Sequence, residues 1–536
     1  MTSARAPYRP FRRVLIANRG EIAVRIVRAC REMGLETVAV ASEPDRAAPH
    51  AMAADRCVVL GAGPASESYL DAGKVLAAAR ESGADAVHPG YGFFSERAEF
   101  AQRVVDAGLV WIGPPPAVID RLGDKVQAKD LARRAGVPTG ASYEGEVTDH
   151  DAVLRAADAI GWPVLVKAAA GGGGRGMRIV HEPAKLREAL DSASREAAAA
   201  FGSGRVFLEK FLEPARHVEI QVLGDVHGDV VSLGERECSI QRRHQKVVEE
   251  SPSPAVGPEL RRRMGDAAVA LAKSVGYVGA GTVEFLLADD GSFSFLEVNT
   301  RLQVEHPVTE LVQGLDLARW QIRASMGEPV AELVRDWTPR GHAIEMRVCA
   351  EDPAMQFAPQ AGRVLHLELP QGPGVRVDCG VRAGYEIPTH YDSLLAKLIV
   401  HGATREQAID RALLALREFV LLGPATNLEY LRAIVGHPEF RAGRLSTSFL
   451  ARHLADWKPE GAAPPEALLA AAAAELLVGG RGGQGAGRAS GDAAESATPW
   501  QTLGPWRVLG GGDLDAEHGS PPSATTRVGP GSGARS

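Results

Sequence analysis

Residues 295–306 alternate strictly between polar and apolar side chains, and this pattern predicts an extended strand. Because successive side chains of a strand point to opposite faces, the polar groups should share one face while Val298, Leu302 and Val304 are buried on the other. A solvated acidic face is the alternative interpretation. The polar positions carry five groups able to bind ligands: Glu297, Asn299, Arg301, Gln303 and Glu305.

The stretch that leads into this strand predicts a β-hairpin turning at Asp290-Gly291, a strong two-residue turn signal. With that loop, Glu284 should stand directly opposite Glu297. Two facing carboxylates repel each other unless a cation lies between them. We therefore predict a divalent metal site, for which carboxylate and amide oxygens favour Mg²⁺ or Mn²⁺ completed by substrate phosphates.

Length and charge narrow the class of protein. A chain of 536 residues should hold two to four domains. Its net charge of −7 does not predict binding to nucleic acid or to an anionic membrane. Since the sequence has no apolar run long enough to span a bilayer and little room for a targeting peptide before residue 13, we expect a cytoplasmic protein. Five scattered cysteines without CxxC spacing predict buried reduced thiols rather than disulfides or a zinc site.

The sequence predicts an α/β segment, then an α+β segment, and then a C-terminal tail. Strand-like and helical segments alternate over residues 13–110, which predicts a doubly wound, Rossmann-like sheet, although one glycine in Asn18–Glu21 does not support dinucleotide binding. Low-complexity sequence follows residue 458 and predicts a linker and disordered tail, with an apolar island at 499–509. The predicted domains are 1–116, 117–330, 331–457 and the tail 458–536.

A glycine-rich loop lies between two predicted strands in residues 164–180. Glycines such as Gly173 and Gly174 let backbone N–H groups approach phosphates, and Lys167 supplies a cation beside them. The loop lacks the ending of a Walker A site, so we interpret it as a mobile flap over a nucleotide. A flexible hairpin without a ligand is the alternative.

Lysine is rare in this chain, with ten lysines against fifty arginines, so each lysine in a motif is informative. Lys125 stands at a predicted helix start, a usual place for an anion contact. Segment 241–246 combines cations with His244 and predicts a local anion pocket, although a surface patch would have the same composition. Similarly, His217 could be structural, and Arg347 could merely pair with Glu345.

Together, the flap, the rare lysines, the facing carboxylates and the cationic segment describe an ATP site that transfers the γ-phosphate to a small anion. Such a transfer needs mainly positioning and charge neutralisation, which these groups can supply.

The chain from about residue 11 to 453 resembles biotin carboxylase, the ATP-grasp component of acetyl-, propionyl- and methylcrotonyl-CoA carboxylases. The motifs that carry the resemblance are 17–23, 88–92, 171–177, 241–246 and 297–307. It implies a Rossmann-like N-terminal domain, an ATP-grasp domain and a C-terminal domain. It also implies that ATP and bicarbonate give carboxyphosphate, which carboxylates N1′ of a biotin attached to a carrier protein.

The resemblance also implies roles for single residues. Glu305 would be the general base toward bicarbonate, Arg347 would stabilise the biotin enolate, and Tyr91 would lie near biotin. Metal ions would bind Glu284, Glu297 and Asn299, and bicarbonate would bind Lys246, Arg301, Gln303 and Val304. ATP would contact Lys125, Lys167, Gly173, Gly174, Glu209, Lys210, Leu212, His217, Gln241 and His244.

The partners implied are a biotin carboxyl carrier protein, a second copy of the chain, and a carboxyltransferase subunit. The acceptor lysine of these carboxylases lies between two methionines, and this sequence has no methionine after Met355. We therefore expect biotin on another polypeptide, or a chain that has been cut short. Two alternatives remain open: another ATP-grasp ligase, such as a carbamoyl-phosphate or amino-acid ligase, and a catalytically silent scaffolding subunit.

Overall fold

The computed structural model describes residues 9–459, except 146, 148, 170–176 and 335–337, together with Glu466, Leu469, Ala470 and Ala473. The chain divides into two units, Met1–Glu460 and Gly461–Ser536. The first unit contains the elements described below. The predicted flap glycines Gly173 and Gly174, the island 499–509 and nearly all of the predicted tail lie outside the described residues.

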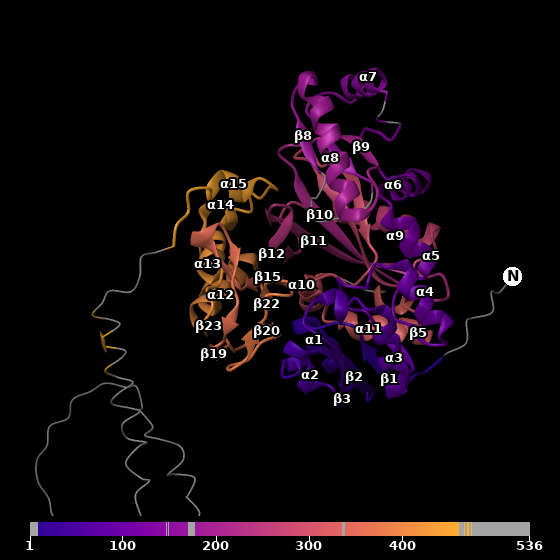
Figure 1. Cartoon of the computed structure of the whole chain (residues 1–536). Helices are drawn as coiled ribbons and strands as arrows, with labels where there is room; N and C mark the ends of the chain where they lie inside the picture. The colour runs from indigo at the N-terminus through magenta and orange to yellow at the C-terminus, as the bar shows by residue number, and fades with distance from the viewer. Residues whose placement is uncertain are drawn as a thin grey trace, which may run out of the picture. The chain divides into compact units, whose positions relative to one another are not determined.

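The N-terminal part is a parallel sheet of order β3-β2-β1-β4-β5, as expected for a doubly wound fold (Figure 1). Its central strand is apolar on both sides, because helices cover both faces of a parallel sheet. The strands are β1 (Arg13–Ile16), β2 (Glu36–Ser42), β3 (Arg56–Gly61), β4 (Ala86–His88) and β5 (Val110–Trp111). The helices are α1 (Gly20–Glu32), α2 (Pro49–Ala53), α3 (Ala72–Ser82) and α4 (Ala98–Asp106).

An eight-stranded sheet forms the centre of the first unit, in the order β14-β13-β10-β11-β12-β15-β22-β20. Its strands are β10 (Arg216–Gly224), β11 (Val230–Arg242), β12 (Gln245–Ser251), β13 (Gly279–Leu287), β14 (Phe293–Asn299), β15 (His342–Cys349), β20 (Val375–Cys379) and β22 (Leu394–Gly402). Because β12 pairs with β15, the sheet runs without a break across the predicted boundary at residue 330.

The predicted pairing of Glu284 with Glu297 is present, but two departures from the predicted hairpin produce it. The loop is one residue longer than expected, since Ala288 N–H bonds to Ser292 O and leaves three residues in the turn. Gly291 in this loop has a φ of +78°, which glycine adopts without strain. A bulge at Leu296 then inserts an extra residue into β14 and restores the pairing of Glu284 with Glu297.

A smaller four-stranded sheet, of order β6-β9-β7-β8, lies beside the nucleotide-binding motifs (Figure 1). Its strands are β6 (Ser142–Tyr143), β7 (Val164–Ala168), β8 (Arg178–Val180) and β9 (Val206–Lys210). Helices α7 (His150–Ile160) and α8 (Leu186–Phe201) pack against it. The predicted glycine-rich connection joins β7 to β8, two paired antiparallel strands, as the sequence indicated.

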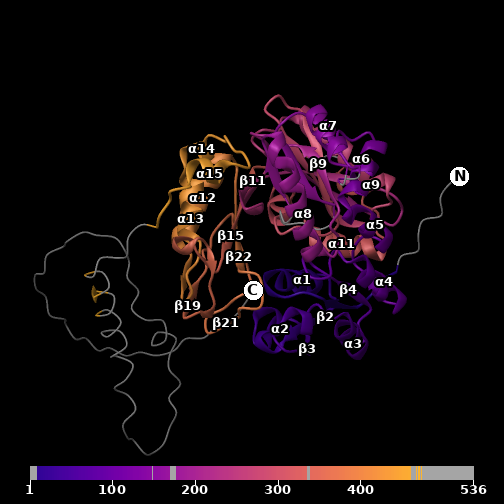
Figure 2. The ribbon, with the colours of Figure 1, turned by 45° about the horizontal axis from the view of Figure 1, so that its top comes forward.

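The remaining helices pack around the two sheets. Helix α12 (Arg405–Glu418) covers β22 and β15 and contacts α13 (Leu428–Gly436), as seen from a second direction in Figure 2. The others are α5 (Pro116–Gly123), α6 (Lys125–Arg134), α9 (Pro258–Ser274), α10 (His306–Gln313), α11 (Leu317–Met326), α14 (Pro438–Arg441) and α15 (Phe449–His453). Short strands form three two-stranded pairs: β16 (Glu351–Asp352) with β17 (Ala358–Pro359), β18 (Gly362–Arg363) with β21 (Glu386–Ile387), and β19 (His366–Glu368) with β23 (Val420–Leu422).

Two predictions about bulk properties can be compared with the fold. All five cysteines are free, but only Cys30 and Cys238 are buried. The prediction of buried thiols is wrong for Cys57, which is exposed on the outer strand β3, and Cys349 and Cys379 are partly exposed. Within the described part of the chain, no helix has the length and apolar character needed to cross a bilayer.

Candidate active site

A cavity of about 790 Å³ lies between the N-terminal sheet, the eight-stranded sheet and the β7–β8 pair. Its walls come from segments far apart in sequence, from Asn18 to Leu394. The cavity gathers most of the predicted site residues: Tyr91, Lys125, Lys167, His217, Gln241, His244, Lys246, Glu284, Glu297, Asn299, Arg301, Gln303, Val304 and Arg347.

Three of the predicted ATP residues line a neighbouring, smaller cavity of about 160 Å³: Glu209, Lys210 and Leu212. Leu296, the extra residue of the β14 bulge, lines both cavities. The bulge therefore turns one side chain toward the place where the two cavities adjoin, a common use of bulges next to active sites.

Basic side chains already neutralise the facing carboxylates Glu284 and Glu297. Lys125, the first residue of α6, forms an ion pair with Glu297. Glu284 accepts a hydrogen bond from Asn299 Nδ2 at 2.8 Å and lies 2.9 Å from His217 Nε2. Burial tends to raise the pKa of Glu284, but Lys246 and His217 hold it well below its usual range. The carboxylate of Glu284 is therefore ionised and available to a cation.

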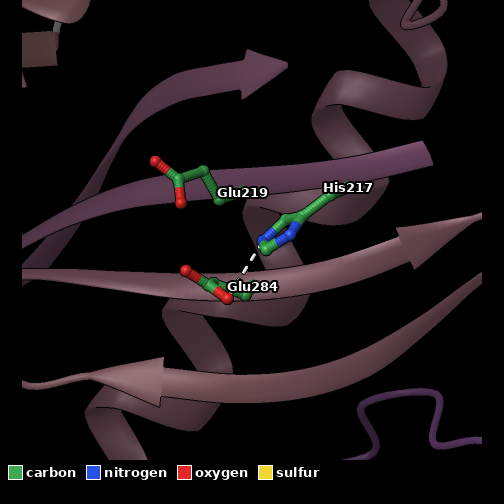
Figure 3. Close-up of side chains that lie close together, drawn as sticks. All are labelled: His217, Glu219 and Glu284. Atoms are coloured by element: carbon green, nitrogen blue, oxygen red, sulfur yellow. Dashed lines mark ion pairs between the residues drawn. The ribbon is translucent and has the colours of Figure 1, made fainter. Parts of the chain in front are cut away.

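His217, Glu219 and Glu284 lie close enough together to hold a metal ion, with one ligand atom from each within 4.8 Å of the others. Figure 3 shows His217 and Glu219 on β10 and Glu284 on the adjacent β13, with their side chains on the same face of the sheet. This set offers two buried carboxylates and one imidazole nitrogen, and the carboxylates suit a hard divalent cation. Glu219 was not among the predicted site residues, although the period-two pattern of 216–221 placed it beside His217.

Lys246 lies at the centre of three carboxylates. Its Nζ is 2.6 Å from Glu219, 2.8 Å from Glu284 and 2.6 Å from Glu305. Burial tends to lower the pKa of Lys246, but these carboxylates raise it well above its usual value. Lys246 is thus a fixed cation shared between the predicted metal site and the predicted bicarbonate site.

The cationic segment 241–246 is a tight hairpin turn between β11 and β12. Its two central residues, Arg243 and His244, have φ angles of +51° and +64°, a conformation that non-glycine residues adopt only under strain. The turn points Gln241, His244 and Lys246 at the cavity. Arg242 instead forms an ion pair with Glu351 at 2.5 Å. The segment therefore does not direct all of its cationic side chains at the cavity.

Glu209 is bound by two lysines. Its carboxylate is 2.6 Å from Lys129 Nζ and 2.9 Å from Lys167 Nζ. Burial tends to raise the pKa of Glu209, but Lys167 and Lys129 lower it to about 2. Lys210 donates to the backbone oxygens of Gly161 and Trp162 and so anchors the segment before β7.

Lys129 contacts the predicted ATP residue Glu209, and the sequence patterns did not reveal it. It lies one helical turn after Lys125 on α6, and its side chain is almost fully buried. Two of only ten lysines, spaced four residues apart on one helix, were a signal that could have been used.

Arg301 connects the predicted metal and bicarbonate residues. It donates to Asn299 Oδ1 at 3.1 Å and to Gln303 Oε1 at 2.8 Å, and Glu96 holds its Nε at 2.9 Å. These bonds fix the guanidinium at the cavity wall, where it can bind an anion. Lys397 donates to the carbonyl of Val304 at 3.0 Å and fixes the backbone just before Glu305.

Arg347 lines the cavity and contacts Glu305, which is fully buried and does not line it. Arg347 Nη2 lies 3.0 Å from Glu305 Oε2, and Arg347 Nε donates to Glu249 at 2.6 Å. The suggestion that Arg347 pairs with Glu345 is wrong, since its hydrogen-bonded partners are Glu249 and Glu305. Burial tends to raise the pKa of Glu305, but Lys246 and Arg347 hold it well below its usual range.

Tyr91 lies at the cavity wall with its hydroxyl bonded to Glu21. Tyr91 follows β4, and Glu21 lies at the start of α1. This bond therefore joins two segments of the N-terminal part at the cavity wall. Burial raises the pKa of Glu21 to about 7, despite the nearby Lys397.

Comparison with known families fits this geometry. Three family models match consecutive segments: "Biotin carboxylase, N-terminal domain" over 10–119, "Carbamoyl-phosphate synthase L chain, ATP binding domain" over 124–333, and "Biotin carboxylase C-terminal domain" over 345–452. A biotin carboxylase from Nostoc sp. is 50% identical over 440 residues, which cover 82% of this chain and 98% of the relative. The chain belongs to the biotin carboxylase family.

Other members of the biotin carboxylase family extend the comparison. A chloroplastic biotin carboxylase from Arabidopsis thaliana is 49% identical over 441 residues, covering 82% of this chain and 82% of the relative. A solved structure, the biotin carboxylase domain dimer of Hydrogenobacter thermophilus 2-oxoglutarate carboxylase with MgADP, ADP and bicarbonate, matches with a TM-score of 0.81 and 44% identity. This match covers 84% of this chain and 99% of that chain.

Membership of the biotin carboxylase family confirms the predicted family, the three-part fold and the class of ATP-dependent ligase. The roles of single residues stay predictions. The structure brings all of them to the two cavities or into direct contact with their walls, except Gly173 and Gly174, which lie outside the described residues.

Proposed function

We propose that this protein carboxylates N1′ of biotin on a carrier protein, using ATP and bicarbonate through carboxyphosphate. The observation that supports this best is the order of contacts among the groups at one cavity. Lys125 and Lys167 line the cavity together with Glu284 and Glu297. From Glu284, contacts lead through Lys246 to Glu305 and then to Arg347. The order of these groups follows the order of the two proposed steps, which are phosphate transfer to bicarbonate and then carboxylation of biotin.

In the first step the phosphates of ATP bind Lys125 and Lys167, which leave their carboxylate partners as the substrate supplies negative charge. A metal ion held by Glu284, Glu297 and Asn299 supplies neutralisation of the phosphate oxygens. Bicarbonate binds Lys246, Arg301, Gln303 and the backbone of Val304. Glu305 takes the bicarbonate proton, and the resulting oxygen nucleophile attacks the γ-phosphorus and releases ADP.

Lys246 couples bicarbonate binding to the strength of the base. Its Nζ lies 2.6 Å from Glu305 and keeps this carboxylate ionised but weakly basic. When a bicarbonate anion shares Lys246, less positive charge acts on Glu305, and the pKa of Glu305 rises. The base therefore gains proton affinity when its substrate is in place.

In the second step Arg347, with Tyr91 nearby, receives the biotin ureido group. The phosphate of carboxyphosphate takes the N1′ proton, N1′ bonds to the carboxyl carbon, and inorganic phosphate leaves. A guanidinium stabilises the enolate that forms when N1′ loses its proton, because a fixed cation in a partly buried site needs no reorganisation during the reaction. Arg347 is mostly buried, with 17% of its side chain exposed, so this condition is met.

Free-biotin carboxylation, measured with and without bicarbonate, tests the proposed function. ADP release that requires bicarbonate, together with carboxybiotin formation, is the expected result. ADP release that requires ammonia or an amino acid instead would favour another ATP-grasp ligase. No turnover with any of these substrates would favour a scaffolding subunit.

The metal assignment predicts a large effect of Glu297→Gln. This change removes a charge without changing the shape of the side chain, and it should cost at least ~2 kcal/mol of transition-state stabilisation. The measurement is the Mg²⁺ dependence of bicarbonate-dependent ATP hydrolysis. Partial recovery at high Mg²⁺ would separate weakened metal binding from misfolding, whereas an unchanged Mg²⁺ dependence would remove the assignment.

The carrier assignment predicts that the 536-residue chain takes up no biotin. When it is made alongside an active biotin ligase, a streptavidin blot should be negative while a known carrier protein on the same blot is positive. Deleting residues 460–536 should leave free-biotin carboxylation nearly unchanged, because every residue that lines the two cavities lies between Asn18 and Leu394. A positive blot, or a folded but inactive truncation, would contradict this part of the proposal.

The proposed partners are a biotin carboxyl carrier protein, a second copy of the chain, and a carboxyltransferase subunit. The solved dimer from H. thermophilus supports pairing with a second copy. The acceptor of the carboxyl group, the domain boundaries and the cytoplasmic location stay predictions.

A further inference from the structure

Two carboxyl groups beneath the cavity lack partners for most of their oxygen atoms. Glu249 on β12 and Glu345 on β15 are directly paired across the two strands, and both are fully buried. Among the described side chains, none donates a hydrogen bond to either oxygen of Glu345 or to Oε2 of Glu249. Directly paired residues present their side chains on the same face with Cβ atoms about 4.5–5.5 Å apart, so the two carboxyl groups are neighbours.

Two buried carboxylates in this position cannot both be ionised without a large cost. Burial raises the pKa of Glu345 well above its usual value, and it raises that of Glu249 to about 7. The charged or titratable side chains around the pair are Lys246 on β12, Arg347 on β15, Lys397 on β22, Arg376 and Asp378 on β20, and Glu305 and His306 at the start of α10. Of these, Lys246 is held by Glu219, Glu284 and Glu305.

None of the surrounding cations is positioned to neutralise Glu345. Lys397 Nζ bonds to the carbonyl of Val304 and lies 3.2 Å from Glu21, and Arg376 is held by Glu310 and Asp378. Protonation of one of the two carboxyl groups is therefore the remaining way to remove the repulsion between Glu249 and Glu345.

The one engaged oxygen of the pair binds Arg347. Glu249 Oε1 accepts from Arg347 Nε at 2.6 Å, and Arg347 Nη2 contacts both Glu249 and Glu305. If Glu249, Glu305 and Glu345 were all ionised, three negative charges would surround one guanidinium. Its ability to stabilise an enolate anion would then be greatly weakened, whereas one proton within the pair removes one of these charges.

Resting on the proposed function, we propose that Glu249 and Glu345 are positioning residues for Arg347 that share one proton. The pair fixes the guanidinium against β12 with one negative charge instead of two. Neither residue lines the cavity, so the pair acts on the reaction through Arg347.

The test compares Glu345→Gln with Glu345→Leu. Glutamine keeps the shape of the protonated acid and can donate a hydrogen bond to Glu249, but it cannot ionise. Leucine removes the donor. We expect Glu345→Gln to carboxylate free biotin at close to the unsubstituted rate at pH 7, and to lose less activity than the unsubstituted protein as the pH rises. Glu345→Leu should lose about tenfold or more in carboxylation, because misorientation of a reacting group is costly. Bicarbonate-dependent ATP hydrolysis should fall less.

Thermal stability gives a second readout that does not depend on activity. A carboxyl group whose pKa is raised above its unfolded value of about 4.3 binds more protons in the folded state, so it destabilises the fold increasingly as pH rises toward the folded pKa. The Tm of Glu345→Gln relative to the unsubstituted protein should therefore increase between pH 5 and pH 8.

Glu250→Gln is the matched control. Glu250 follows Glu249 on β12 and is also buried, but it is held by His342 at 2.6 Å and Arg405 at 2.7 Å. Glu250→Gln should lower Tm, but it should leave the loss of carboxylation activity at high pH unchanged.

Equal carboxylation rates for Glu345→Gln and Glu345→Leu would overturn the shared-proton proposal. A glutamine variant that follows both the pH profile and the Tm trend of the unsubstituted protein would overturn it as well. If the unsubstituted protein carboxylated no biotin, the proposed function would fail instead, and the Tm comparison would still decide whether the pair holds a proton.

Discussion

Replacing Glu305 by glutamine is expected to lower both bicarbonate-dependent ATP hydrolysis and biotin carboxylation by ~10²–10⁴-fold, the usual contribution of a general base. Lys246 and Arg347 donate to different oxygens of Glu305, so glutamine can keep only one of these two hydrogen bonds. It also cannot take the proton of bicarbonate. Both activities should fall together, because carboxyphosphate must form before biotin reacts. The measurement is ADP release and carboxybiotin formation from the same reaction mixture.

Glu310→Gln is the control for Glu305→Gln. Glu310 lies further along α10 and is also buried, but it binds Arg25 and Arg376 rather than Lys246 and Arg347. Its loss should reduce stability while the folded protein keeps both activities. If Glu305→Gln hydrolysed ATP with bicarbonate at the unsubstituted rate, Glu305 would not be the base.

Local sequence patterns predicted the elements that carry the site. Asn299 and Arg301 both line the cavity, as the alternation at 295–306 predicted. The predicted strand over all of 295–306 is wrong, however, because β14 ends at Asn299 and residues 300–305 are not a strand. The period of two therefore accounts for Asn299, whereas the turn after β14 places Arg301. The hairpin pairing of Glu284 with Glu297 was also predicted, but the sequence could not reveal the longer loop and the bulge at Leu296 that produce it. Small shifts in register depend on packing that spans the whole sheet.

The electrostatic partners could not be predicted in the same way. Lys246 meets Glu219, Glu284 and Glu305 only because three strands and the start of α10 converge. Likewise, Glu249 faces Glu345 because β12 pairs with β15 across a long stretch of intervening chain. Residue type and spacing can single out a charged side chain in the sequence. Only the fold determines which oppositely charged group lies beside it. For this reason Arg347 was assigned its role but not its partners.

Arg347→Ala is expected to separate the two half-reactions. Carboxylation of free biotin should fall by ~10²–10³-fold, the cost of removing one group that stabilises an oxyanion. Bicarbonate-dependent ATP hydrolysis should fall far less, because Arg347 contacts Glu305 and Glu249, whereas Lys125 and Glu297 pair with each other.

Arg405→Ala controls for the loss of a buried ion pair on β12, since Arg405 binds Glu250 at 2.7 Å and does not line the cavity. This variant should lose stability but keep the ratio of the two activities. The decisive measurement is therefore that ratio in Arg347→Ala compared with Glu305→Gln. A ratio that is the same in both variants would mean that Arg347 acts before carboxyphosphate forms, and the division of roles between Glu305 and Arg347 would be wrong.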